Sequence, residues 1–279
     1  MKILVPIKRV ADPDNANKVK VSADGTQVTT EGLEWKMNPF DEWALEAALR
    51  LTEDGAAKSR VGEVVLVSVG PKEAVATVRE GLAKGAERGV IVEGNDNDLD
   101  SNVIAAALAA VAKKESPDLI VMGKQTVDGD SNVAGTVLAD KLGWPIINYA
   151  MRIETSDDGK TFAIKRDLDV GVASVKVTGP VVITVSDSIL HPESVKNGVT
   201  PADFKYPEAE GGRYASLKGI MQAKKKPIAE QTLSGLGVDA KRTVTYKKFE
   251  LPPARSGQTT FVESVEELVE KLRTEAKVL

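Results

Sequence analysis

The chain of 279 residues contains no cysteine and a single histidine, His191. The absence of cysteine excludes disulfides, thiolate metal sites and a cysteine nucleophile, so folding does not require oxidation. One histidine cannot form a histidine-rich metal site, and no Ser-His-Asp set can be assigned around it. We therefore predict no catalytic residue, and no metal site built on histidine or cysteine.

Long apolar runs and a strong charge of one sign are also missing. The first apolar run, Ile3-Leu4-Val5, is far shorter than the ~20 apolar residues that span a bilayer, so we expect no membrane insertion. Thirty-seven basic and 41 acidic residues give a net charge of −4, which provides no overall cationic field for nucleic acid. We expect a cytoplasmic protein, or an organellar-matrix protein if a presequence has been removed.

The apolar residues that are present, 42% of the chain, alternate between two patterns. Short continuous runs indicate strands at 3–7, 64–67, 89–92 and 119–122. Amphipathic stretches indicate helices from about Pro39, and at 71–82, 101–114 and 131–142. This alternation is typical of βαβ units, so we predict a Rossmann-like, mostly parallel sheet with helices on both faces.

Four segments depart from that alternation. We expect a hairpin at 18–30, further strands after Pro145 of which at least two are antiparallel, and a polar surface insertion or linker at 191–212. The tail beyond Lys224 ends in a helix at 262–277. Its stretch 227–260 has too few apolar residues for its own core, so we expect it to lie against its own domain or a partner chain.

Ligands of open parallel sheets bind at the carboxyl ends of the strands, here the loops after Ile7, Val69 and Met122. The loop after Met122 carries two glycines before a predicted helix, an arrangement that suits a phosphate. Neither a Walker loop nor Gly-x-Gly-x-x-Gly is present, so the spacing alone indicates only generic anion binding.

Each of these features also has a plain structural interpretation. The glycines can serve an ordinary turn while Asp130 or Ser131 caps the next helix, and Asn38 before Pro39 is typical of a helix cap. Asp128 and Asp130 could instead hold Mg²⁺, but this acidic spacing is common in loops and we predict no bound metal. The run Lys224-Lys225-Lys226 is typical of a solvated surface.

Four segments, in this order and spacing, resemble the β subunits of electron-transfer flavoproteins over nearly the whole chain. They are Val5-Pro6-Ile7-Lys8-Arg9-Val10, Met37-Asn38-Pro39-Phe40-Asp41, the loop from Gly123-Lys124-Gln125 to Gly135, and the segment from Arg213 to Lys226. The resemblance implies an adenine-nucleotide-binding α/β domain at 1–190, an insertion and partner-recognition loop at 191–226, and at 227–279 an arm that contacts an α subunit.

In most of that family the β chain binds AMP, and the resemblance implies the same set of binding residues in this sequence. The set comprises Pro6, Asn38, Pro39, Phe40, Asp41, Val69, Gly123, Lys124, Gln125, Thr126, Val127, Asp128, Gly129, Asp130, Ser131, Asn132, Val133 and Ala134. Val133 and Ala134 replace a Gln-Thr pair, so phosphate binding would depend on backbone amides and Asn132. In flavin-bifurcating relatives the pocket holds a second FAD, and Asp128-Gly129-Asp130 resembles those members. The arm and the segment Leu217-Lys218-Gly219 resemble the AMP-binding members more closely, so AMP is the expected ligand and FAD the alternative.

The resemblance also implies two partners. The α subunit of the heterodimer would hold the redox-active FAD, and dehydrogenases would dock through the loop of Leu217, Lys218 and Met221, where Lys218 replaces a common proline. The implied function is to relay electrons from dehydrogenases to a quinone-linked or other acceptor, without catalysis by this chain. A stand-alone nucleotide-binding module and a nucleotide-hydrolysing or adenylating enzyme are the alternatives.

Overall fold

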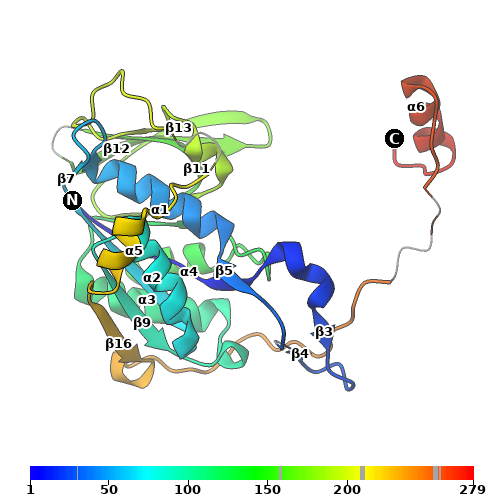
Figure 1. Cartoon of the computed structure of the whole chain (residues 1–279), viewed down its shortest axis with the longest axis horizontal. Helices are drawn as coiled ribbons and strands as arrows, with labels where there is room; N and C mark the ends of the chain where they lie inside the picture. Colours follow the sequence, from blue (N-terminus) through cyan, green and yellow to red (C-terminus); the bar gives the residue numbers. More distant parts are fainter. Residues whose placement is uncertain (30, 157–158, 208–210, 254–256, 258) are drawn as a thin grey trace. The chain divides into compact units, whose positions relative to one another are not determined.

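The structure, a computed structural model, describes residues 1–29, 31–156, 159–207, 211–253, 257 and 259–279. It consists of two compact units, which are described separately: one formed by 1–19 and 30–246, the other by 20–29 and 247–279. The first unit contains the large sheet and most of the helices in Figure 1.

The large sheet follows the order β13-β12-β11-β14-β10-β1-β8-β9-β16, with β15 paired to β11. All neighbours from β11 to β16 in this order are parallel, whereas β11, β12 and β13 pair antiparallel. The strands are β1 (Lys2–Pro6), β8 (Glu63–Gly70), β9 (Arg88–Glu93), β10 (Leu119–Gly123), β11 (Ile146–Thr155), β12 (Thr161–Leu168), β13 (Gly171–Thr178), β14 (Val181–Val185), β15 (Val195–Lys196) and β16 (Ile228–Thr232).

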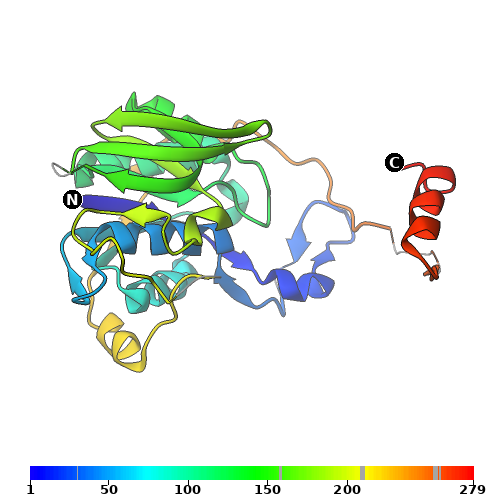
Figure 2. The ribbon, with the colours of Figure 1, turned by 90° about the horizontal axis from the view of Figure 1, so that it is seen from above.

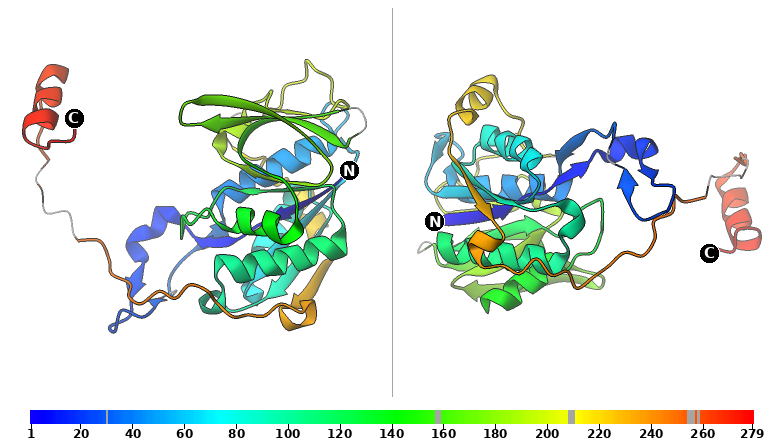
Figure 3. Two further views of the ribbon diagram at one scale, coloured as in Figure 1. Left: turned by 180° about the vertical axis from the view of Figure 1, so that it is seen from behind. Right: turned by 90° about the horizontal axis from the view of Figure 1, so that it is seen from below.

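Helices cover both faces of this sheet, because successive side chains of a strand point to opposite faces. Ile3 and Val5 of β1 belong to the core beneath α1 and α2, while Leu4 between them belongs to the core beneath α3 and α4. The left view of Figure 3 shows the face of the sheet that α3 and α4 cover. The helices of the first unit are α1 (Pro39–Leu51), α2 (Val75–Lys84), α3 (Ser101–Glu115), α4 (Ala134–Leu142) and α5 (Leu217–Ala223). The predicted Rossmann-like α/β fold is confirmed.

The chain reverses its direction of travel across the sheet between β1 and β10. From β1 it moves through β8 to β9, and then returns to place β10 on the other side of β1. Two neighbouring strands whose connections leave in opposite directions open a crevice at their carboxyl ends, which is where ligands bind in such sheets. The fold thus singles out the loops after β1 and β10.

The antiparallel strands predicted after Pro145 are present, and Figure 2 shows β11, β12 and β13 side by side. The segment 191–212, expected as an insertion or linker, partly packs into the first unit. Its strand β15 pairs with β11, and Tyr206 is buried with its ring under the guanidinium of Arg50 at 4.6 Å.

The tail begins as part of the large sheet. Residues Ile228 to Thr232 form β16, which pairs in parallel with Gly89 to Glu93 of β9. Farther along, the backbone and hydroxyl of Thr243 bind Oδ2 of Asp100 at 2.6 and 2.8 Å. The tail was expected to lie against its own domain or against a partner chain. Up to residue 246 it lies against its own domain.

The second unit contains the predicted hairpin and the final helix. Strands β3 (Lys20–Val21) and β4 (Val28–Thr29) pair antiparallel, and Thr30, which the prediction included, lies outside the described residues. Helix α6 (Val265–Thr274) begins after Ser264, whose hydroxyl accepts from the amide of Glu267 at 3.1 Å. Its apolar residues Val265, Leu268 and Val269 are exposed within the described chain.

Two further two-stranded pairs belong to the first unit, β2 (Arg9–Ala11) with β5 (Trp35–Met37), and β6 (Glu53–Asp54) with β7 (Ser59–Arg60). Short 3₁₀ turns are η1 (Pro13–Lys18), η2 (Lys72–Ala74), η3 (Asp96–Asp98), η4 (Asp187–Leu190) and η5 (Ser234–Leu236). Among the described residues, no helix combines the length and apolar content needed to cross a membrane.

Candidate functional site

Asn38 joins the two loops at the crevice between β1 and β10. It precedes α1, but its side chain does not cap that helix, so the capping interpretation is wrong. Its amide nitrogen instead donates to the carbonyl of Gln125 at 2.9 Å, and its amide oxygen accepts from the backbone of Val127 at 3.1 Å. Because the Asn38 side chain is fully buried, these bonds hold the loop after β10 in one position.

Asp41 performs the same role one turn farther into α1. Its Oδ2 accepts from the backbone amide of Lys8 at 2.8 Å, and its carboxylate also accepts from the amide of Gly123. Burial raises the pKa of Asp41 to about 7, against the opposing effect of these bonds. A side chain at position 123 would collide with Asp41 and Phe40, which explains why the loop begins with glycine.

Polar contacts hold the next part of the loop, residues 125–130, in a compact turn. Oδ2 of Asp128 lies 2.6 Å from Nζ of Lys8, and Oδ1 accepts from the hydroxyl of Thr126 at 2.6 Å. Oδ1 of Asp130 accepts from the side chain of Gln125 at 2.6 Å. The two carboxylates that could share Mg²⁺ thus have separate partners, and no group of three metal-ligating side chains occurs in the described part of the chain.

Helix α4 begins at Ala134, three residues later than predicted, and neither Asp130 nor Ser131 caps it. The reason is local: Asp130 and Asn132 have φ of 48° and 50°, in the left-handed region, which prevents a continuous helix through 130–132. The N-cap residue is Val133, which has no side-chain acceptor to offer. The first amides of α4 therefore remain available to an external acceptor, as at phosphate sites.

The other residues of the predicted set lie around the same edge. Pro6 is buried at the end of β1, and the half-buried Val69 lies near the end of β8. Nζ of Lys124 lies 5.2 Å from the ring centre of Phe40, whose ring also packs edge-on against Trp43. Gly129 is exposed, and a Cβ added there would lie 4.0 Å from Oγ1 of Thr126. The fold thus brings together residues that are separated by more than 80 positions.

Arg9 is a cationic residue of this edge that the predicted set omitted. Its guanidinium lies 4.0 Å above the ring of Trp35, and Nη2 pairs with Oδ2 of Asp96 at 2.9 Å. Its Nε is buried and has no hydrogen-bond partner among the described residues. A buried donor without an acceptor is unusual and suggests a missing ligand. The sequence could have indicated Arg9 by its position, because Lys8 and Arg9 come shortly after the end of β1, where ligands of such sheets bind.

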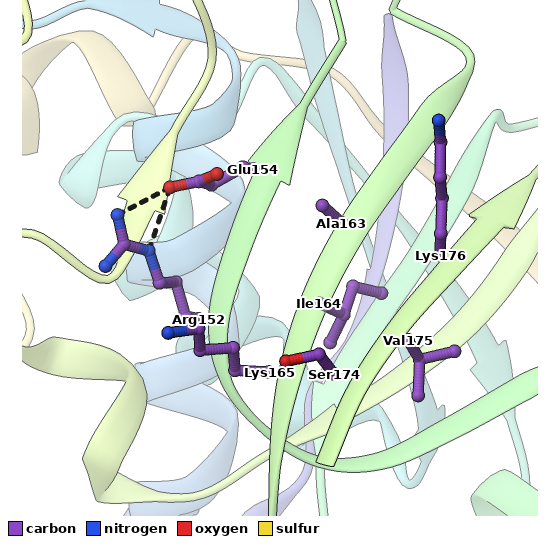
Figure 4. Close-up of a pocket in the computed structure, with 8 residues that line it drawn as sticks. All are labelled: Arg152, Glu154, Ala163, Ile164, Lys165, Ser174, Val175 and Lys176. Atoms are coloured by element: carbon purple, nitrogen blue, oxygen red, sulfur yellow. Dashed lines mark hydrogen bonds and ion pairs between the residues drawn. The ribbon is translucent and has the colours of Figure 1, made fainter. Parts of the chain in front are cut away.

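A hollow lies on the antiparallel strands, far along the sheet from β1 in strand order. Its volume is about 410 Å³, and Figure 4 shows Arg152, Lys165 and Lys176 at its border. The guanidinium of Arg152 already pairs with Glu154. The hollow contains neither a helix N-terminus nor any residue of the predicted set, so it is not our candidate nucleotide site.

The predicted partner-recognition residues lie on the short helix α5. Leu217 and Met221 expose 83% and 70% of their surface, and Lys218 is also exposed. The helix packs on α2, where Arg79 donates to the carbonyls of Ala223 and Lys226 at 2.7 and 2.6 Å. Lys226 is not simply solvated as predicted, because its Nζ donates to the carbonyl of Leu82 in α2 and to that of Ala86 just after the helix.

Beneath the chain that leads into α5 is a buried group of charges. Arg213 donates to Glu46 at 2.8 Å and to Glu53 at 2.6 Å, and Glu46 also accepts from Arg50 at 2.8 Å. Burial acts to raise the pKa of Glu46, but Arg213 and Arg50 hold it below its ordinary value. Position 213 is thereby fixed to α1.

Comparison with known proteins identifies the family. The model of the electron transfer flavoprotein domain matches residues 25–236 of the chain. The chain belongs to the electron-transfer flavoprotein family. It is 41% identical to the electron transfer flavoprotein subunit beta of Bradyrhizobium diazoefficiens over 279 residues, which cover both proteins completely.

Other relatives of this electron-transfer flavoprotein chain are similarly named. The mitochondrial subunit beta of Arabidopsis thaliana is 40% identical over the full length of both proteins. The subunit beta of Homo sapiens is 36% identical over 98% of this chain and 97% of its own. The resemblance found in the sequence is thus confirmed: the chain is a β subunit of this family.

Proposed function

We propose that this β subunit binds AMP in the crevice between β1 and β10. The phosphate would lie against the loop 123–134 and the first amides of α4, and the adenosine would lie near Pro6, Asn38 to Asp41 and Val69. Backbone amides suit this task because they supply oriented donors without a side chain.

The unpaired, buried Nε of Arg9 carries the proposal, together with the uncapped start of α4. Both are donors that need an acceptor, and phosphate and ribose oxygens are acceptors. Lys8, which pairs with Asp128, and Lys124 supply positive charge at the loop that contains Asp128 and Asp130, so a bound dianion would lie beside cations as well as carboxylates.

The second part of the proposal concerns electron transfer. A FAD held mainly by an α subunit would supply the redox chemistry, since flavins and not side chains carry electrons in such proteins. This chain would help to enclose that subunit with its C-terminal arm, residues 227–279, and would contribute no catalytic residue. The exposed apolar residues of α6 support this role, because a partner surface would remove them from water.

The third part concerns the electron donors. Leu217, Lys218 and Met221 on α5 would dock a dehydrogenase, from which electrons pass to a quinone-linked or other acceptor. Support comes from the exposure of Leu217 and Met221 on a helix whose last residue, Ala223, is held by Arg79 of α2, and whose preceding chain is held at Arg213. A fixed apolar side chain loses little conformational freedom on binding, so a small contact can contribute much of the affinity.

Counting the nucleotides released from the purified complex tests the proposal. The full chain is co-expressed with its α partner, the complex is denatured, and the released compounds are separated and quantified. We expect one FAD and one AMP per complex. Two FAD and no AMP would mean that a second FAD occupies this subunit, the alternative that Asp128-Gly129-Asp130 suggests. AMP without a flavin-bearing partner would instead favour a stand-alone nucleotide-binding module.

A further inference from the structure

Tyr149 has a strained backbone at a bulge in the large sheet. Its φ of 59° lies in the left-handed region, which an aromatic residue rarely adopts and a glycine adopts freely. The pairing of β11 with β14 shifts register between Ile147 and Ala150, on either side of this residue. Strain of this kind persists where the surrounding structure requires it, and it is frequent at binding sites.

The bulge directs the Tyr149 side chain to the loop that precedes α4. The side-chain amide of Asn132 donates to the Tyr149 hydroxyl at 2.5 Å. Nζ of Lys124 lies 5.7 Å from the Tyr149 ring centre, as well as 5.2 Å from that of Phe40. Both neighbours of Tyr149, Asn132 and Lys124, belong to the set of nucleotide-binding residues predicted from the sequence, whereas Tyr149 does not.

Two contacts make this arrangement rigid. The Tyr149 amide donates to Oγ1 of Thr184 at 3.2 Å, and that hydroxyl in turn donates to the side chain of Asn148 at 3.1 Å. Thr184 is buried on β14, the strand next to β10. The bulge is therefore fixed to the same part of the sheet that carries the loop after β10.

The hydroxyl of Tyr149 has one proton left to donate. It accepts from Asn132, and none of the described residues accepts its own hydrogen. A phenol can donate one hydrogen bond while it accepts another, so the hydroxyl can bind an oxygen beside Asn132. A phosphate oxygen is the matching acceptor at this place, because a bond from a neutral donor to a charged acceptor is stronger than one between neutral groups.

We propose that Tyr149 is a further residue of the nucleotide site, which holds the Asn132 side chain and donates a hydrogen bond to the phosphate of the bound nucleotide. This inference rests on the proposed function. It assigns the strained tyrosine to phosphate recognition and not to the adenosine part of the ligand.

The test compares AMP with adenosine. The complex of the full chain with its α partner is stripped of nucleotide, and the Kd of each ligand is measured by calorimetry for wild type and Tyr149→Phe. We expect AMP binding to weaken about tenfold in the variant, the loss of one bond to a charged group, with adenosine binding unchanged. Tyr214→Phe, at a tyrosine that is 96% exposed, is the matched control and should leave both values unchanged.

The possible outcomes are distinct. If the wild-type complex binds no AMP, the proposed function fails and this inference with it. If wild type binds AMP and Tyr149→Phe binds it equally well, or if AMP and adenosine lose affinity by the same factor, the proposed function stands and the role of Tyr149 is wrong. A second variant, Tyr149→Gly, relieves the backbone strain, and we expect it to weaken AMP binding at least as much as Tyr149→Phe without a lower melting temperature.

Discussion

At the edge between β1 and β10, polar side chains are buried and bind backbone groups of neighbouring loops, whereas on α5 apolar side chains are exposed on a helix that packs on α2. Asn38 and Asp41 illustrate the first arrangement, and Leu217 and Met221 illustrate the second. The comparison shows two ways to prepare a surface for binding. The polar edge is held by its own hydrogen bonds and keeps unpaired hydrogen-bond donors for a ligand. The apolar helix α5 is held by its packing on α2 and exposes apolar side chains to a partner.

The largest expected effect comes from removing the buried ion pairs of Arg213, in the chain that leads into α5. Arg213→Ala leaves Glu46 and Glu53 with one partner fewer, and we expect about 3–5 kcal/mol of lost stability, since a buried charge without its partner is costly. Urea denaturation measures the free energy of unfolding. Arg273→Ala, on exposed α6, is the control and should cost less than about 0.5 kcal/mol. An equal loss in both variants would contradict the structural role of Arg213.

The pH dependence of stability tests the polar edge. Because the pKa of Asp41 is raised to about 7, the folded chain keeps this proton between pH 4 and 7 while the unfolded chain loses it. The contribution of Asp41 to stability is thus complete below about pH 4 and declines as the pH rises to about 7, by an amount of order 2–4 kcal/mol.

Asp41→Asn removes this titration. Relative to wild type, the free energy of unfolding of the variant should therefore increase between pH 4 and 7 and then level off. The control is Asp187→Asn, in a 3₁₀ turn outside the crevice, which should run parallel to wild type. A constant difference between Asp41→Asn and wild type over this range would show that Asp41 does not titrate as described.

A smaller effect is expected from Asn38→Ala. The change leaves the carbonyl of Gln125 and the amide of Val127 without their partner and should cost about 2 kcal/mol of stability. AMP binding to the complex should weaken as well, because the loop loses its fixed position. Asn97→Ala, at an exposed asparagine, is the matched control for both measurements. If Asn38→Ala binds AMP as tightly as wild type, nucleotide binding does not depend on the hydrogen bonds that Asn38 makes to the loop.

The smallest effect on stability is expected at the apolar surface. Leu217→Ala removes a side chain that is 83% exposed, so the free energy of unfolding should change by less than about 0.5 kcal/mol. The AMP affinity should also stay the same, whereas electron transfer from a partner dehydrogenase should slow. Lys224→Ala, at the exposed residue directly after α5, serves for comparison. A large loss of stability in Leu217→Ala would mean that the residue is part of the core.

Much of this architecture was predictable because its signals are local. The start of α1 at Pro39 and the apolar runs of β1, β8 and β10 follow from the residue types of each segment. Strand β16 was missed because its sequence, Ile-Ala-Glu-Gln-Thr, is polar for a strand, and only its pairing with β9 makes it one. An edge strand needs few apolar residues, so pattern alone does not reveal it.

Within the site, the loops could be predicted from the sequence, but the hydrogen bonds between them could not. The bonds from Asn38 to residues 125 and 127 and from Arg213 to Glu46 span more than 80 positions, and no local pattern encodes them. The left-handed backbone of Tyr149 is equally invisible, because a tyrosine in an apolar run predicts an ordinary strand. These are places where tertiary packing, and not local preference, decides the conformation.

The central claim is that a nucleotide binds at the β1–β10 edge and not elsewhere on the chain. Backbone hydrogen exchange of the nucleotide-stripped complex, followed with and without AMP, tests this directly. We predict that AMP slows exchange in the segments 7–9, 38–41 and 123–136, and that it leaves 152–176 and 217–223 unchanged. Slower exchange confined to 152–176, around the hollow of the antiparallel strands, would contradict the account.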